Sequence, residues 1–297
     1  MASRSIHLML VAAHPADSFD QAGGTLAHHA AQGDAVTVVI ATTGVRSHHW
    51  GLMDEKQKRG EDFDVEERIQ AAVEEKLEEV RNACRILGFD DVRGLGFDDD
   101  DLLLTQEKIN AIADMIREVR PDILITHHPY ESGGLKMHGT IGQATVFAWQ
   151  AASGTGKGRQ IRHHVPVLYF MNPLAYMGNN SPEYAGTQRA DLYIDISDVV
   201  EKKVQAMDYI ASQHYGGAYA RKRAEYEDGH HGNHAMVAYA EQFQRFLPIT
   251  DAELEKIDEP SIVMLGRRSE LSAAFVPLPE GMQFTSRYRH GKEKYDD

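Results

Sequence analysis

Short apolar runs of strand length alternate with longer helical patterns along most of this 297-residue chain. The run at residues 6–13 is apolar almost throughout, as expected of a strand that is buried on both faces. Comparable runs predict strands at residues 36–41, 92–97, 123–126, 165–170 and 192–196. Strands separated by helices connect through right-handed crossovers and pair in parallel. The alternation therefore predicts a Rossmann-like α/β fold, with a mostly parallel twisted sheet and helices on both faces.

Helical patterns fill the intervals between these strands. The first covers residues 24–32 and ends at Gly33, and a long amphipathic one covers residues 66–87 and ends at Gly88. Its apolar stripe is predicted to contain Ile69, Val73, Leu77, Val80 and Cys84. Thr105 is expected to cap a helix that runs to residue 119, and Ser197 a helix that runs to about residue 212. Residues 236–246 are also predicted to be helical.

A single α/β domain is predicted to span residues 1–250, because the chain contains no internal repeat and no low-complexity tract. Residues 251–297 contain Pro277, Pro279 and Gly281 before a charged end. We expect them to form a C-terminal tail that packs on the domain or on a neighbouring subunit of a homo-oligomer.

The acidic composition narrows the range of partners. The chain has 31 Lys and Arg against 45 Asp and Glu, a net charge of −14, which argues against binding to nucleic acid or to an anionic membrane. Cys84 is the only cysteine, so no internal disulfide is possible. No stretch approaches the about 20 apolar residues that a membrane-spanning helix needs. We therefore expect a cytoplasmic protein that acts on a small molecule.

Polar side chains follow the predicted strands, where each strand ends. They include His14 and Asp17 after the first strand, Arg46, His48, His49 and Trp50 after the second, and His127, His128, Tyr130, Glu131 and His138 after the fourth. Ligands of an open parallel sheet bind outside the carboxyl ends of its strands. Histidines and carboxylates gathered at such a rim are typical of a catalytic metal site. Because His127 and His128 are adjacent, only one of the two is expected to face the site.

Residues 13–27 read Ala-His-Pro-Ala-Asp-Ser-Phe-Asp-Gln-Ala-Gly-Gly-Thr-Leu-Ala, which resembles the signature of the PIG-L/LmbE-like superfamily. That signature usually reads Ala-His-Pro-Asp-Asp-Glu, followed after a few residues by Gly-Gly-Thr-Leu-Ala. Residues 121–127 resemble the strand that leads to the superfamily's second metal motif. Residues 221–223, Gly229 and residues 239–243 are similar to its closing segment, so the resemblance covers about residues 6–248.

The resemblance implies one zinc ion per subunit, held by His14, Asp17 and His138. Two imidazoles and one carboxylate leave a coordination position open for water, and iron or manganese would also fit this set of ligands.

Three motifs depart from the superfamily pattern. The general base of the hydrolases is the first Asp of the Asp-Asp pair, and Ala16 stands at that position here. The His-Pro-Asp-His motif is replaced by Leu-Lys-Met-His at residues 135–138, and the Gly-Glu after the second strand is replaced by Gly-Val at residues 44–45. The metal ligands are thus kept, while the usual acid and base residues are absent.

Other side chains near the rim are candidates for the missing roles. A neutral histidine within about 3 Å of a metal-bound water can act as a general base. The candidate catalytic residues are His48, His128, Glu131 and Asp20. The candidate substrate-binding residues are Arg46, His49, Trp50, Tyr130 and Lys136.

Three functions are open. Hydrolysis of an amide or N-acyl bond by a metal-bound water, as in PIG-L-type deacetylases, is placed first because hydrolases predominate in the superfamily. The second is hydration of an unsaturated carboxylic acid, because the superfamily's 4-oxalomesaconate hydratases carry a similar Ala-Asp pair. The third is a metal-binding member of the superfamily that catalyses no reaction.

Overall fold

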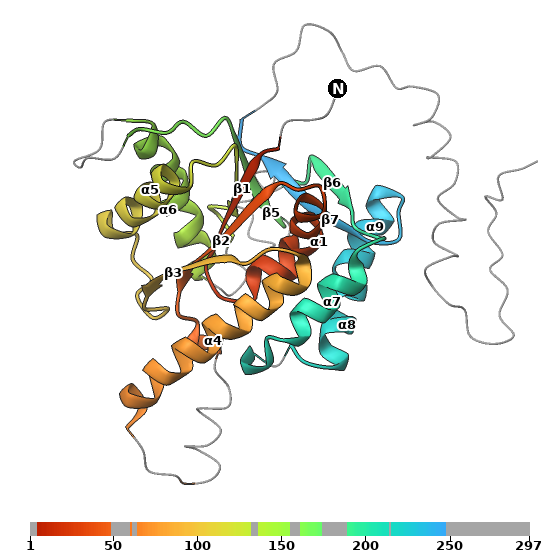
Figure 1. The fold of residues 1–297 in the computed structure, drawn as a ribbon, viewed down its shortest axis with the longest axis horizontal. Helices are drawn as coiled ribbons and strands as arrows, with labels where there is room; N and C mark the ends of the chain where they lie inside the picture. The colour runs from red at the N-terminus through yellow and green to blue at the C-terminus, as the bar shows by residue number, and fades with distance from the viewer. Residues whose placement is uncertain are drawn as a thin grey trace, which may run out of the picture.

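The computed structural model describes residues 5–48, 60, 64–131, 136–154, 161–173, 189–213 and 215–247. All strands in these ranges belong to one sheet, ordered β3-β2-β1-β4-β5-β7-β6 (Figure 1). They are β1 (His7–Ala12), β2 (Ala35–Thr42), β3 (Asp91–Phe97), β4 (Ile123–His127), β5 (Val167–Met171), β6 (Leu192–Asp195) and β7 (Ala240–Arg245). Strands β1 to β5 pair in parallel, and β7 lies antiparallel between β5 and β6. The predicted α/β fold with a mostly parallel sheet is confirmed.

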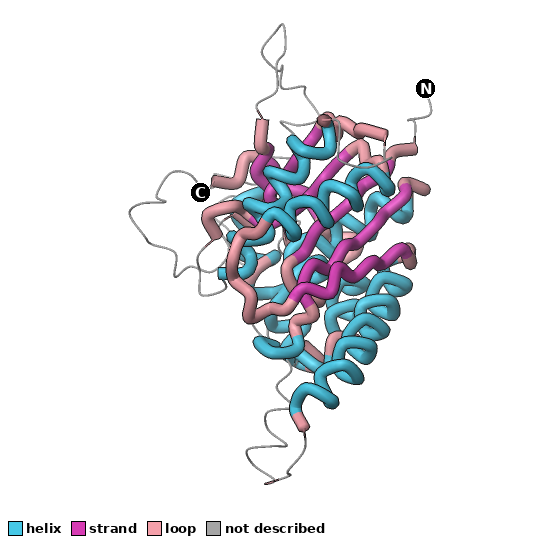
Figure 2. The backbone as a smooth tube through the Cα atoms, turned by 90° about the vertical axis from the view of Figure 1, so that its left-hand side faces the viewer, coloured by secondary structure: helices cyan, strands magenta, loops and turns pink. Residues whose placement is uncertain are grey.

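Helices cover both faces of the sheet (Figure 2). One face packs against α1 (Asp17–Ala31), α4 (Val65–Leu87), α7 (Val200–Asp208) and α8 (Ala218–Tyr226). The other face packs against α5 (Gln106–Val119) and α6 (Lys136–Ser153). The remaining described elements are the short α2 (Val45–His48), η1 (Ala211–Gln213) and α9 (Asp228–Ala235). The predicted tail at residues 251–297 lies outside the described residues.

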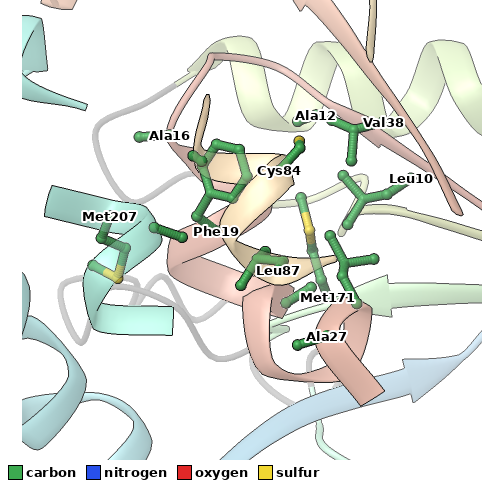
Figure 3. Close-up of a cluster of buried hydrophobic side chains, with 14 of the residues drawn as sticks. Leu10, Ala12, Ala16, Phe19, Ala27, Val38, Cys84, Leu87, Met171 and Met207 are labelled. Atoms are coloured by element: carbon green, nitrogen blue, oxygen red, sulfur yellow. The ribbon is translucent and has the colours of Figure 1, made fainter. Parts of the chain in front are cut away.

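Alternation along β1 divides the buried side chains between two cores. Leu8 and Leu10 belong to the core beneath α1 and α4, whereas Met9 and Val11 belong to the core beneath α5 and α6. Figure 3 shows the first of these cores, with Cys84 of α4 among its labelled side chains. Burial raises the pKa of the Cys84 thiol, which fits a packing role. Because both faces of β1 are buried, its sequence has to be apolar at successive positions.

Both ends of α4 are set by residues that favour helix termini. The Asp64 side chain accepts a hydrogen bond from the Glu66 backbone N–H at 2.9 Å, and Gly88 ends the helix in the left-handed conformation at φ 105°. Ile69, Val80 and Cys84 of the predicted stripe are buried, whereas in the middle of the helix Lys76 is buried and Leu77 is only partly so.

The predicted helix at residues 236–246 is wrong. Residues 240–245 form β7, which pairs with Tyr169–Met171 of β5 on one side and with β6 on the other. The residues Tyr-Ala-Glu-Gln-Phe at 239–243 include good helix formers, so local propensity favours a helix. Hydrogen bonds from two neighbouring strands override that propensity, and their presence depends on the tertiary fold.

Two predicted helix starts also differ. Ser197 does not cap α7: its hydroxyl donates to Asp195 at 2.6 Å, and α7 starts at Val200. Helix α1 starts at Asp17 rather than at residue 24. Gly23 and Gly24 disfavour a helix locally, yet here they lie inside one because other elements pack closely against them. None of the helices in the described ranges has both the length and the apolar character needed to cross a membrane.

Gly24→Ala tests this close packing. A Cβ at position 24 would lie 2.5 Å from Cγ2 of Ile196, so we expect the free energy of unfolding to fall by about 1–3 kcal/mol. Chemical denaturation followed by circular dichroism measures the change. Gly229→Ala in α9 is the matched control, because the nearest atom to its Cβ would be 3.8 Å away. An equal loss of stability in both variants would contradict this explanation.

Candidate metal centre

Three side chains meet at the carboxyl edge of the sheet, between β1 and β4. His14 follows β1, Asp17 is the first residue of α1, and His138 lies in the first turn of α6, after β4. The chain leaves β1 towards one face of the sheet and β4 towards the other, so the two loops diverge and leave a crevice. The fold therefore brings together residues that are more than 120 positions apart in the sequence.

One carboxylate oxygen lies at the centre of this cluster. Oδ2 of Asp17 is 3.3 Å from Nδ1 of His14 and 3.2 Å from Nε2 of His138. The two imidazole nitrogens lie 3.2 Å from each other. All three side chains are buried. The nitrogen or oxygen atom that each could offer to a metal lies within 4.8 Å of the other two. The structure thus brings together the three metal ligands that the resemblance implies.

Glu131 fixes the orientation of His138. Its Oε1 lies 2.5 Å from Nδ1 of His138, so Nδ1 carries a proton and Nε2 points towards Asp17 and His14, where it would present a lone pair to a bound metal. Burial opposes ionisation of Glu131, but His138 and His127 outweigh it and lower its pKa to about 2. Burial would also lower the pKa of His138, but Asp17 and Glu131 raise it to about 10. The cluster therefore favours positive charge, which a divalent cation would supply.

His127 is a further member of the cluster that the sequence analysis did not select. Its Nε2 is 3.2 Å from Oδ2 of Asp17, and its ring stacks on His138 with centroids 4.0 Å apart. The same Nε2 accepts the Ala13 backbone N–H at 2.9 Å, so its lone pair is used. Nδ1 then carries the proton and lies 3.3 Å from Oε2 of Glu131. His127 supports the cluster as a neighbour and does not fit as a fourth ligand.

The donor set fits a zinc ion. Two imidazole nitrogens and one carboxylate oxygen are the ligands of many catalytic zinc sites, with the remaining position open. The backbone N–H of His14 donates to Oδ2 of Asp17 at 2.7 Å, which fixes the carboxylate in place. A carboxylate bonded to the far nitrogen of a ligating histidine, as Glu131 is here, is a regular part of such sites.

Helix α6 reaches the cluster because it lies directly on the loop after β4. A Cβ at Gly142 would lie 2.5 Å from the backbone oxygen of His127, so no larger residue fits there. This close approach brings the start of α6, and with it His138, over the end of β4.

Two of the candidate bases have other partners. Asp20 receives hydrogen bonds from Nε and Nη2 of Arg223 at 3.0 and 2.7 Å, and from the Tyr215 hydroxyl at 3.2 Å. Glu131 binds His138, as described above. These contacts suit structural and positioning roles better than proton transfer from water.

His128 and Tyr130 lie on the other side of β4 from His127. The His128 ring packs edge-on against Phe170 of the second core, with centroids 5.1 Å apart. Its Nδ1 accepts the Tyr130 backbone N–H at 3.2 Å, while the Tyr130 side chain is half exposed. Only one histidine of the pair faces the metal ligands, as the alternation predicts, and it is His127.

Arg46 bridges two carboxylates at the rim. Its guanidinium donates to Asp98 at 2.9 Å and to Glu66 at 2.9 Å, and hydrogen bonds to both raise its pKa. It would have to exchange one of these partners to bind a substrate. Four further candidate site residues lie outside the part of the chain that the structure describes. These are the side chains of His48 and Lys136, and all of His49 and Trp50.

Comparison with known families and curated proteins gives consistent matches. A family model described as PIG-L, GlcNAc-PI de-N-acetylase, matches residues 9–149. A probable N-acetyl-alpha-D-glucosaminyl L-malate deacetylase 2 of Bacillus cereus is 29% identical over 213 residues, covering 70% of this chain and 83% of the relative. A 4-oxalmesaconate hydratase of Pseudomonas putida is 30% identical over 211 residues, covering 70% of this chain and 74% of the relative.

Solved structures show the same fold. The 4-carboxy-2-hydroxymuconate hydratase of Pseudomonas putida superposes with a TM-score of 0.67 at 24% identity, covering 84% of this chain and 100% of that one. The N,N'-diacetylchitobiose deacetylase of Pyrococcus horikoshii superposes with a TM-score of 0.65 at 16% identity, covering 82% of this chain and 84% of that one. At these identities the likeness shows the architecture, which both enzymes share.

Glu131→Gln tests the support of the metal ligands. Loss of the negative charge beside Nδ1 weakens the electron donation of His138, so we expect zinc affinity to fall about 10- to 100-fold. Competition with a chromogenic chelator measures it, and circular dichroism checks the fold. His234→Gln, which removes an exposed histidine of α9, is the control. Unchanged affinity in Glu131→Gln would show that Glu131 does not support a zinc ligand.

Proposed function

The chain belongs to the PIG-L family, and from this membership and the metal centre we propose that it is a zinc-dependent enzyme that uses water to convert a small polar substrate. The observation that carries the proposal is the convergence of His14, Asp17 and His138 within 4.8 Å, with Glu131 hydrogen-bonded to the outer nitrogen of His138. Other divalent metals fit the same ligands.

The residues of the centre have separate roles in this proposal. His14, Asp17 and His138 hold the metal, and Glu131 sets the tautomer of His138. When bound, the metal acts as a Lewis acid and lowers the pKa of a coordinated water to about 7. The side chains around it therefore have to orient the substrate and move protons, and the reaction depends on which of them can do so.

Position 16 discriminates between two reactions. Hydrolysis of an amide needs a group that takes a proton from water and gives it to the departing amine. Ala16 stands where the family's hydrolases have that carboxylate, and its methyl group belongs to the first core. Of the candidate replacements with described side chains, Asp20 is bound to Arg223, Glu131 to His138, and His128 faces the second core.

Addition of water to an unsaturated carboxylic acid fits this arrangement best. The water oxygen adds to one carbon of the double bond and a proton is delivered to the other carbon. No amine departs, so the carboxylate that the family's hydrolases carry at position 16 is not needed to protonate a leaving group. A Pseudomonas putida relative named as a 4-oxalmesaconate hydratase is 30% identical to this chain. We therefore place hydration first, whereas the sequence alone had placed hydrolysis first.

Hydrolysis of an amide or N-acyl bond is the second candidate. It is favoured by the similarity to the Bacillus cereus deacetylase, which extends over 83% of that relative's length. The His48 side chain, whose position the structure does not describe, would be the base in this case.

Product analysis by mass spectrometry separates the two reactions. The zinc-loaded protein is incubated with 4-oxalomesaconate and, separately, with N-acetylglucosaminyl malate. We expect a single product heavier than the unsaturated acid by one water, and no acetate from the N-acetyl sugar. His138→Ala is the inactive control, because it lacks one metal ligand. Release of acetate alone would reverse the proposed order, and no turnover of either substrate by zinc-loaded protein would favour a silent metal-binding protein.

Ala16→Asp tests the importance of position 16. The family's hydrolases carry Asp at this position beside the same metal-ligand motif, so the variant is expected to fold. A carboxylate here should raise hydrolysis of N-acetylglucosaminyl malate by a factor on the order of 10². Ala16→Asn is the matched control, because its side chain has nearly the same size and shape but takes no proton. Equal hydrolysis rates in both variants would show that position 16 does not decide the reaction.

A further inference from the structure

A second buried cluster of charges packs against α1, about two turns further along the helix than Asp17. Lys203 of α7 donates to Asp228 of α9 at 2.8 Å and to Glu241 of β7 at 2.9 Å. Side-chain exposure is 0% for Lys203, 3% for Asp228 and 1% for Glu241, so water screens none of these charges. Burial raises the pKa of Asp228 to about 8 even though Lys203 opposes the shift.

The Glu241 carboxylate also binds the backbone of α1. Its Oε1 accepts the Gly24 N–H at 2.8 Å, and its Oε2 accepts the Thr25 N–H at 2.8 Å. Both N–H groups lie in the middle of the helix, where they ordinarily bond to the carbonyl four residues earlier. β7 is therefore joined to α1 by a bidentate charged contact, about 215 residues apart in the sequence.

This contact requires the two glycines of the Gly-Gly pair. A Cβ at Gly23 would lie 3.3 Å from Cγ of Lys203, and one at Gly24 would lie 2.5 Å from Cγ2 of Ile196. A side chain at position 24 would push α1 away from the residue after β6, and one at position 23 would press on the Lys203 side chain of α7. The pair thus allows the helix to lie close enough for Glu241 to reach its backbone.

The position of this contact relates it to the metal centre. Asp17 and Gly24 are seven residues apart, which is about two helical turns, so they lie on nearly the same face of α1. A contact that fixes this face at residues 24 and 25 fixes the rotation of the helix about its axis. That rotation decides whether Oδ2 of Asp17 points towards His14 and His138.

We propose that Glu241 is a positioning residue of the metal centre, which holds α1 in the rotation that directs Asp17 towards the other ligands. The inference rests on the proposed metal-dependent function, and Lys203 contributes by holding the Glu241 carboxylate. Two other contacts to α1, the first core and the Arg223–Asp20 pair, remain in place when Glu241 is changed. Loss of Glu241 should therefore shift Asp17 without unfolding the helix.

Zinc affinity of four variants, measured by chelator competition, separates positioning from general stability. Glu241→Gln removes one of the two carboxylates that bind Lys203 and offers one acceptor to two N–H groups, so both melting temperature and zinc affinity should fall. The double variant Lys203→Met/Glu241→Gln also removes the buried ammonium, and burial raises the pKa of the Asp228 carboxyl that is left behind, so its melting temperature should recover part of this loss. Its zinc affinity should stay about tenfold below that of the native protein, because the contact to α1 is still lost.

Glu241→Asp and Ile112→Ala complete the test. Glu241→Asp keeps the charge beside Lys203 but shortens the side chain, so it should weaken zinc binding with a smaller loss of stability than Glu241→Gln. If the other variants fail to fold, the zinc affinity of Glu241→Asp still tests the inference. Ile112→Ala destabilises the second core, on the opposite face of the sheet, and should leave zinc affinity unchanged. Zinc affinity that follows melting temperature in all variants would overturn the inference.

The native protein distinguishes this inference from the proposed function. If the native protein binds zinc but turns over neither substrate, the proposed reaction fails, while the effect of Glu241 on zinc affinity is still measured. If it binds no zinc at all, both the proposed function and this inference are overturned.

Discussion

The convergence of three imidazoles on one buried carboxylate oxygen is the interaction on which the rest of the site depends. Oδ2 of Asp17 lies within 3.3 Å of ring nitrogens of His14, His127 and His138. A buried carboxylate is costly unless positive charge or donors compensate it. The parallel sheet provides the arrangement, because the ends of β1 and β4 are neighbours while their loops diverge. The site is thus a consequence of strand order as much as of residue type.

The sequence predicted the fold, and it predicted that His14, Asp17 and His138 meet at the edge of the sheet, for identifiable reasons. The continuous apolar run of β1 reflects the burial of both its faces, and the neighbouring strands β2 and β4 have the same pattern. The strand at residues 240–245 was missed because its hydrogen-bonding partners, β5 and β6, are far away in sequence. His127 was missed because adjacent histidines differ only in the face to which they point. The alternation of β4 would have identified it, since Ile125 and His127 share the face of α1.

The candidate acid and base residues show where sequence reasoning stops. A carboxylate near a rim can be a base, a ligand or a support, and only its partners decide. Glu131 and Asp20 were equivalent candidates in the sequence, yet Glu131 binds His138 and Asp20 binds Arg223. The replacement of the usual carboxylate by Ala16 then has a clear meaning. The chain keeps the residues that are proposed to hold the metal, and it has Ala where the family's hydrolases carry the carboxylate that transfers protons.

X-ray absorption spectroscopy of the zinc-loaded protein tests the central claim most directly, because it reports the atoms bound to the metal. The account predicts stoichiometric zinc with two imidazole nitrogens at about 2.0–2.1 Å and oxygen ligands from one carboxylate and water. Substitution of His14, Asp17 or His138 should change that first coordination shell. A spectrum with fewer than two imidazoles, or one that is unaffected by these substitutions, would contradict the account.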